Sequence, residues 1–117
     1  ILVGRGGADN DHLTLKIARG RDVWLHARDW AGAHVIIQLN KGTEPDHDTL
    51  MDAALLAAHY SKGKENTFTD VRYTLAKHVK KPKGAPAGRV TVAGAKNIAV
   101  RQDPSRLERL MQARTAL

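Results

Sequence analysis

An alanine-rich apolar stripe between residues 47 and 60 most constrains what this chain can fold into. Ala53, Ala54, Ala57 and Ala58 follow Leu50 at helical spacing. This periodicity predicts an amphipathic helix with its apolar side turned toward a core. Because alanine side chains are small, they allow close approach, and we expect the helix to pack against a sheet.

Strand-forming stretches occupy much of the remaining chain. Residues 1–3, 22–28, 34–39, 71–79, 89–93 and 97–101 are rich in β-branched and aromatic residues. The second and third are expected to pair around a turn at Ala31 and Gly32. Two further helices are predicted: one at residues 11–19, capped by Asn10, and one at residues 106–114, started by Asp103-Pro104-Ser105.

The order of these elements predicts an α+β fold with a mixed or mostly antiparallel sheet and about three helices. A chain of 117 residues with 42% apolar residues suffices for one compact domain, which we expect to span residues 1–117, with a C-terminal helix from about residue 102. No apolar run approaches the roughly 20 residues of a membrane helix. No signal peptide is visible before Ile1, and we expect the chain to be a piece of a longer one.

Cysteine is absent, which excludes disulfides, thiolate catalysis and cysteine-based zinc sites within this sequence. The absence fits a reducing compartment, and we expect a cytoplasmic protein that does not bind a membrane.

Positive charge is concentrated in one part of the chain. Residues 62–101 hold ten lysines and arginines against two acids, whereas the rest holds nine against ten. The segment YTLAKHVKKPKGAPAGRVTV, residues 73–92, contains no acid at all. A neutral scaffold with one basic region points to a polyanionic partner, although a solvated surface is the plainer alternative.

Aromatic side chains near this region could stack on bases. Tyr60, Phe68 and Tyr73 lie within or beside it, although the strand position of Tyr73 favours a core role. Trp24 is expected to be packed inside, whereas Trp30, beside a glycine turn, is expected to be exposed.

Six histidines also suggest a metal site. His26 and His34 lie on neighbouring predicted strands, with Asp22 and Asp29 close in sequence, so a site of two histidines and one carboxylate is conceivable. The spacing matches no specific metal motif, and histidines on strands more often make structural hydrogen bonds. We therefore expect no metal and no cofactor. A metal-dependent nuclease or hydrolase, or a module that docks an acidic protein, remains the alternative.

Three segments together resemble a known family. GRGGADNDHLTLKIARGRDVWLHARDWAGAHVII is similar to the first half of the NFACT-R domain, AAHYSKGK to its helix end, and VRYTLAKHVKKPKGAPAGRVTVAGAKNIAV to its basic segment and last strands. The motifs run in the family's order from about Ile1 to Val100. Ala31, Ala33, Ala87 and Arg72 depart from the family pattern, as do Gly6 and Gly7.

The resemblance implies a domain of ribosome-associated quality-control factors, which bind large ribosomal subunits that still carry peptidyl-tRNA and promote template-free tailing of the stalled chain. Full-length members also carry an NFACT-N domain, a helix-hairpin-helix domain and a coiled coil. Tail addition is therefore not assigned to this segment alone, and no catalytic residue is assigned.

We accordingly expect an RNA-binding module that grips tRNA or ribosomal RNA through its phosphates. The expected contacts are Arg5, Lys16, Trp30, Lys62, Lys77, Lys80, Lys81, Lys83 and Arg89. Asn10, Asp11, His26 and His34 are expected to orient the site.

Overall fold

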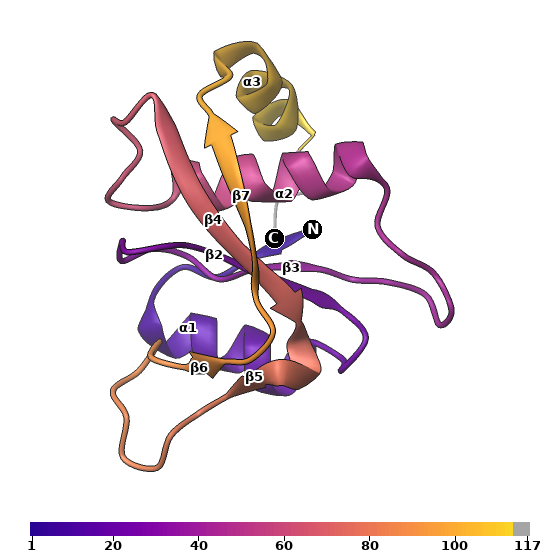
Figure 1. The fold of residues 1–117 in the computed structure, drawn as a ribbon, viewed down its shortest axis with the longest axis vertical. Coiled ribbons are helices and arrows are strands. Elements are labelled where there is room, and N and C mark those ends of the chain that lie inside the picture. The colour runs from indigo at the N-terminus through magenta and orange to yellow at the C-terminus, as the bar shows by residue number, and fades with distance from the viewer. Residues whose placement is uncertain (114–117) are drawn as a thin grey trace.

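The alanine-rich segment forms helix α2, His47–His59, in the computed structural model, which describes residues 1–113. Asp46 caps the helix: its Oδ1 accepts a hydrogen bond from the backbone N–H of Thr49 over 2.7 Å. Ala53, Ala54, Ala57 and Ala58 are all 0% exposed. The helix therefore lies directly on the sheet, as its alanine content predicts (Figure 1).

Five antiparallel strands form the main sheet in the order β1-β3-β2-β4-β7. Their bounds are β1 Leu2–Val3, β2 Val23–Ala27, β3 Val35–Ile37, β4 Phe68–Leu75 and β7 Lys96–Arg101. The predicted hairpin is present, because β2 pairs with β3 through Trp24 and Ile36. The α+β fold and the antiparallel sheet are confirmed.

Side chains alternate between the two faces of the sheet and build two cores. Toward α2, Leu25, Val35 and Val71 are each 0% exposed. On the opposite face, Trp24 and Ile36 pack with residues from the smaller elements. Those elements are helix α1, Gly7–His12, its π-helical continuation η1, Leu13–Ile17, and the two-stranded sheet of β5, Val79–Lys80, and β6, Thr91–Val92.

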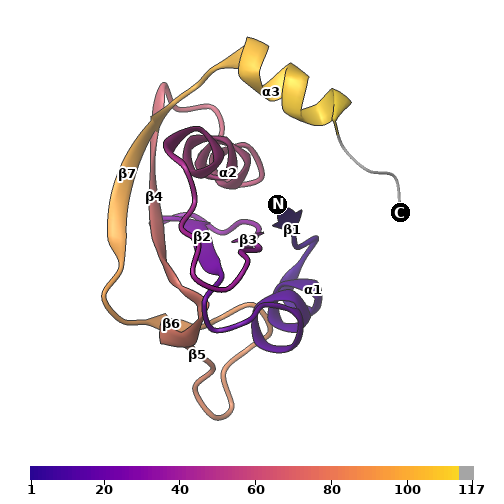
Figure 2. The same cartoon turned by 90° about the vertical axis from the view of Figure 1, so that its right-hand side faces the viewer.

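Helix α3, Pro104–Gln112, packs on the outer side of α2 (Figure 2). Asp103 caps it by accepting from the backbone N–H of Arg106, and Leu107 and Leu110 reach the core. The Arg106 Nε atom lies 2.7 Å from Asp52 on α2. Asp103-Pro104-Ser105 starts this helix as predicted, although the first helical residue is Pro104 rather than Arg106, and the predicted end at Arg114 lies outside the described residues.

The first helix differs from the sequence prediction. It begins at Gly7 rather than after Asn10, and Asn10 is a buried helical residue, not the cap. Its side chain instead accepts from the backbone N–H of His34 and donates to the carbonyl of Gly32, over 3.0 and 3.3 Å. Asn10 therefore binds residues that are distant in sequence, Gly32 and His34, and does not cap the helix.

The predicted strands at residues 71–79 and 89–93 are also corrected. β4 starts earlier, at Phe68, and ends at Leu75, where a 3₁₀ turn, Ala76–His78, carries the chain into the second sheet. Val79 belongs to the second core because of this change of sheet. Only Thr91 and Val92 of the later stretch are extended and paired, since Arg89 N–H donates to Pro86 O in a turn.

Among the helices within residues 1–113, none combines the length and apolar character needed to cross a membrane.

Candidate nucleic-acid interface

The basic loop between β5 and β6, residues 81–89, is fastened to helix α1 by one carboxylate. Asp11 Oδ1 accepts a hydrogen bond from the backbone N–H of Gly88 over 3.0 Å, and Asp11 Oδ2 lies 3.0 Å from Lys81 Nζ. Lys81 also donates to the carbonyl of Pro86 within the same loop. Asp11 thus binds residues at both ends of the loop, Lys81 and Gly88. The ammonium group of Lys81 is paired with this carboxylate.

His34 holds the same loop from the sheet. Its ring Nε2 lies 3.2 Å from Gly88 O and its Nδ1 lies 2.8 Å from Thr14 Oγ1. A carbonyl oxygen only accepts, so Nε2 carries the proton and Nδ1 accepts from the Thr14 hydroxyl. Burial, together with the neighbouring His26, lowers the pKa of His34 to about 4. The imidazole is therefore neutral at physiological pH, and in this form Nδ1 is available to accept the hydrogen bond from Thr14.

Glycines allow the loop to pass close to α1. Gly88 has φ = +83°, a left-handed conformation that favours glycine, and an added Cβ there would lie 3.1 Å from Gly7 Cα. At Gly7 itself, a Cβ would lie 2.9 Å from the carbonyl oxygen of Ala87. The two backbones touch, so the path of the loop is set by helix α1.

His26 packs inside an aromatic cluster rather than in an open site. Its ring stacks on Trp24, with centroids 5.8 Å apart and planes 6° apart, and meets the edge of His34 at 5.3 Å. Burial lowers the pKa of His26 as well. Trp24 is 1% exposed, so the expectation that it is packed is confirmed.

This packing does not favour the alternative metal site. Both ring nitrogens of His34 already have hydrogen-bond partners. The Asp22 carboxylate accepts from the backbone N–H groups of Arg19 and Leu39, over 2.8 and 2.9 Å. Within the part of the chain that the structure describes, no three histidine, aspartate or glutamate side chains gather as a metal site would require.

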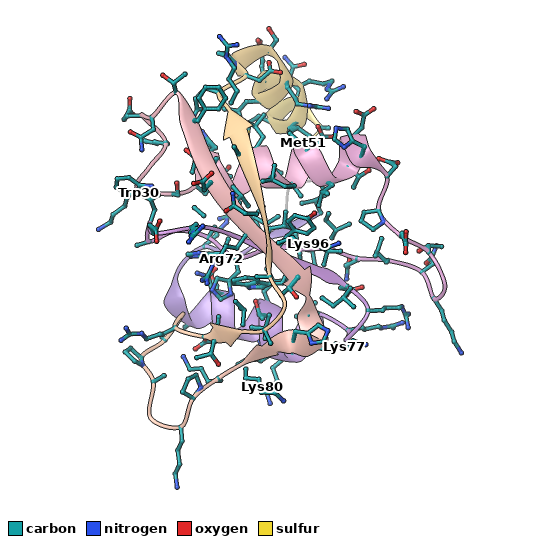
Figure 3. The ribbon with its side chains drawn as sticks, in the orientation of Figure 1. Trp30, Met51, Arg72, Lys77, Lys80 and Lys96 are labelled. Atoms are coloured by element: carbon teal, nitrogen blue, oxygen red, sulfur yellow. The ribbon has the colours of Figure 1, made fainter. Side chains whose placement is uncertain are left out.

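Four exposed cations lie on the anchored loop or in the segment that leads into it. Lys77 follows β4 in the 3₁₀ turn, Lys80 ends β5, and Lys83 and Arg89 lie on the loop itself. Figure 3 shows Lys77 and Lys80 at the same end of the molecule. No carboxylate within residues 1–113 forms an ion pair with any of the four. We call Lys77, Lys80, Lys83 and Arg89 the basic end. Arg5 and Lys16, before and after α1, are exposed as well.

Trp30 and Lys62 form a separate group. The backbone N–H of Lys62 donates to Ala31 O over 2.9 Å, and Gly32 pairs with Ser61 in an isolated bridge. Trp30 is 41% exposed, as expected, and its indole covers Gly63, where an added Cβ would lie 2.7 Å from Nε1. In Figure 3, Trp30 lies apart from Lys77 and Lys80, so the predicted contact residues do not all share one patch.

The three other aromatics have different environments. Tyr73 is partly buried and packs on the α2 side, as its strand position favours, while the Tyr60 hydroxyl donates to Met111 Sδ over 3.5 Å. Phe68 is 57% exposed at the start of β4. Phe68 is a possible stacking residue from the sequence, but the expected contacts do not include Phe68, Arg72 or Arg101, although the alternation of β4 could have placed the first two on one face.

Comparison with known proteins gives concordant results. The model of the NFACT protein RNA binding domain matches residues 1–98. The chain is 40% identical over 113 residues to the "Rqc2 homolog RqcH" of Bacillus subtilis strain 168, covering 97% of this chain and 19% of that protein. The Streptococcus suis protein of the same name is 40% identical over 100 residues, covering 86% of this chain and 18% of the relative. The chain therefore spans about a fifth of the length of these curated relatives.

A solved structure is similar over most of the chain. It is titled the structure of the C-terminal of the fibronectin/fibrinogen-binding protein from Streptococcus suis. The TM-score is 0.84 at 35% sequence identity, with 92% of this chain and 43% of the other covered.

Proposed function

Since the chain belongs to the family of NFACT RNA-binding domains, we propose that it binds transfer or ribosomal RNA through the phosphates, at the basic end. Lysine and arginine neutralise phosphates and release counterions, which produces affinity with little sequence preference. The observation that carries the proposal is that the four cations of the basic end are exposed and lack carboxylate partners within residues 1–113.

The anchored loop supports this proposal. A loop that must order itself on binding loses conformational entropy, and this loss reduces affinity. Here Asp11, His34 and Gly88 hold the loop in shape before any ligand arrives. We assign Lys81 to this anchor and Lys80 and Lys83 to phosphate contacts. Arg5, Lys16, Lys62 and Trp30 are proposed as outer contacts for an RNA that extends beyond the basic end.

The similarity to longer proteins named Rqc2 homologs suggests the setting of this activity. We propose that the domain helps such a protein engage the large ribosomal subunit and its tRNA during ribosome-associated quality control of stalled nascent chains. On this proposal the domain is a binding module, and its surface, not a catalytic group, provides the function.

The test is the salt dependence of RNA binding by the double variant Lys80→Gln/Lys83→Gln. Each lost phosphate contact should lower the slope of log affinity against log salt by about one, so the double variant should lose about two. The loss should be similar for tRNA and for a ribosomal RNA fragment, because phosphates carry no sequence information. Binding is measured by fluorescence anisotropy between low and physiological salt.

Lys41→Gln is the matched control, because Lys41 is an exposed lysine in the turn that precedes α2. It removes one lysine charge elsewhere and should leave the slope unchanged, whereas each single variant, Lys80→Gln or Lys83→Gln, should lower the slope by about one. An unaltered affinity and slope in the double variant would overturn the assignment of the basic end.

A further inference from the structure

One face of the sheet carries arginines and a phenylalanine that the basic end does not include. β2, β4 and β7 pair in register, so that His26 lies opposite Arg72 and Arg72 opposite Asn97, while Phe68 lies opposite Arg101. These residues alternate with Val71, Ile98 and Val100, which pack toward α2. The named side chains therefore belong to the face opposite α2.

Much of this face is open. In Figure 1, β4 and β7 cross in front of the other elements, and in Figure 2 no element covers their outer side above β6. Asp70, Asn97, Ala99 and Arg101 are exposed, and Phe68 is 57% exposed. We call Phe68, Asp70, Arg72, Asn97 and Arg101, together with Arg28 beside them, the open sheet face.

The charges on the open sheet face are not balanced. It carries three guanidinium groups and one carboxylate, and that carboxylate, Asp70, accepts a hydrogen bond from Asn97 Nδ2 over 3.2 Å. In the part of the chain that the structure describes, Arg72 and Arg101 have no ion-pair partner, and Arg72 Nε is buried without a hydrogen-bond partner. Arg28 has only the exposed Asp29, at 3.9 Å. The surface is thus complementary to an anion.

Phe68 adds a feature that phosphate binding alone does not need. Its exposed fraction is larger than that of any other large hydrophobic side chain in residues 1–113. The Arg101 guanidinium carbon lies 6.0 Å from the centroid of its ring, so ring and charge are side by side. Aromatic rings beside basic groups on an exposed sheet are a general means of binding unpaired bases, since every base offers a flat face for stacking.

We propose that the open sheet face binds a single-stranded segment of RNA, with one base stacked on Phe68 and phosphates held by Arg72 and Arg101. A duplex does not fit this arrangement, because its bases are already stacked and hidden from the ring. In the view of Figure 3, Arg72 is seen between Trp30 and Lys80. The inference rests on the proposed RNA-binding function and extends it to an unpaired strand.

The test replaces Phe68 by leucine, which keeps an apolar side chain and removes the ring, and by tryptophan, which keeps a ring. The probes are a fluorescently labelled twelve-nucleotide oligouridine and an RNA duplex with labelled ends. Phe68→Leu should weaken oligouridine binding by about 5- to 100-fold with an unchanged salt slope, because stacking involves no counterion release. Phe68→Trp should bind as well as the natural chain or better, and neither variant should alter duplex binding.

Ile17→Ala is the matched control, since Ile17 is an apolar side chain 43% exposed on η1. It should leave both affinities unchanged. Arg101→Gln should weaken oligouridine binding and also reduce the salt slope. Circular dichroism checks that each variant is folded, as we expect for Phe68 variants because this residue is 57% exposed.

The outcomes separate the two proposals. Equal oligouridine affinity in Phe68→Leu and the natural chain would overturn the proposal that the open sheet face binds RNA. A protein partner would then be the alternative ligand of this face. If Lys80→Gln/Lys83→Gln still weakens binding in that case, the basic end stands alone. If the natural chain binds neither probe nor tRNA, the proposed function itself fails. Equal losses in Phe68→Leu and Phe68→Trp would contradict stacking.

Discussion

His34 connects three parts of the chain that are far apart in sequence: helix α1, strand β3 and the basic loop. Its imidazole is 1% exposed and neutral, with a pKa lowered to about 4 from the ordinary 6.5. At a pH between these values the unfolded chain binds a proton at this position and the folded chain does not. Folding is therefore opposed progressively as the pH falls through this interval.

We predict that acidification from pH 7.5 to pH 4.5 destabilises the natural chain more than His34→Gln. The contribution of His34 should be fully present above pH 6.5 and decline toward pH 4, by up to about 3 kcal/mol in the free energy of unfolding. Urea unfolding across this pH range provides the measurement. His26, whose pKa is also lowered, shifts stability in the same direction; because His26 interacts with His34, the comparison is repeated in a His26→Gln background to isolate His34. Parallel pH profiles would show that His34 is protonated equally in both states.

For single residues, the sequence shows which side chains are polar or charged, but not which residues they bind in the fold. Asn10 and Asp11 can be recognised as polar residues at the start of a helix, and a capping role follows from local rules. The structure gives both of them tertiary partners instead, at Gly32, His34, Lys81 and Gly88. Contacts across more than twenty residues depend on topology, which local propensity does not contain.

At the scale of the elements, α2 depends on its small side chains. Ala57 is 0% exposed and lies in the core between the helix and the sheet. Ala57→Leu adds atoms where no space exists, so it should lower the free energy of unfolding by about 1–3 kcal/mol. Chemical denaturation measures this change. Ala95→Leu, at an exposed alanine in the turn before β7, should have little effect, and equal losses in both variants would contradict close packing under α2.

Helices and strands whose apolar residues recur regularly can be predicted from the sequence. The point at which the chain leaves one sheet and enters another cannot. α2 and β7 are found within one residue of their expected bounds, because their apolar residues face one core. The stretch from Val71 to Val79 is predicted as one strand, yet Val71 faces one core and Val79 the other. The 3₁₀ turn that separates them carries no glycine or proline to mark it. The open sheet face was not predicted because it depends on strand pairing. Phe68 and Arg101 become neighbours only when β4 pairs with β7.

At the scale of the whole molecule, the two cores lie on opposite faces of one sheet and share its strands. We therefore predict that residues 1–117 unfold as a single cooperative unit, which is the behaviour of one domain. In a Trp30→Phe variant, Trp24 is the remaining tryptophan and its fluorescence follows the second core, while far-ultraviolet circular dichroism follows the chain as a whole. Their thermal transitions should coincide, whereas two separated midpoints would contradict a single unit.

The anchoring of the basic loop also has a consequence for the order of synthesis. Asp11, Thr14 and His34 all precede the loop in the chain, and strand β5 ends immediately before it. A ribosome that translates this sequence releases these three anchoring residues before the loop itself emerges. The segment proposed to meet RNA thus leaves the exit tunnel after Asp11, Thr14 and His34, the residues that anchor it.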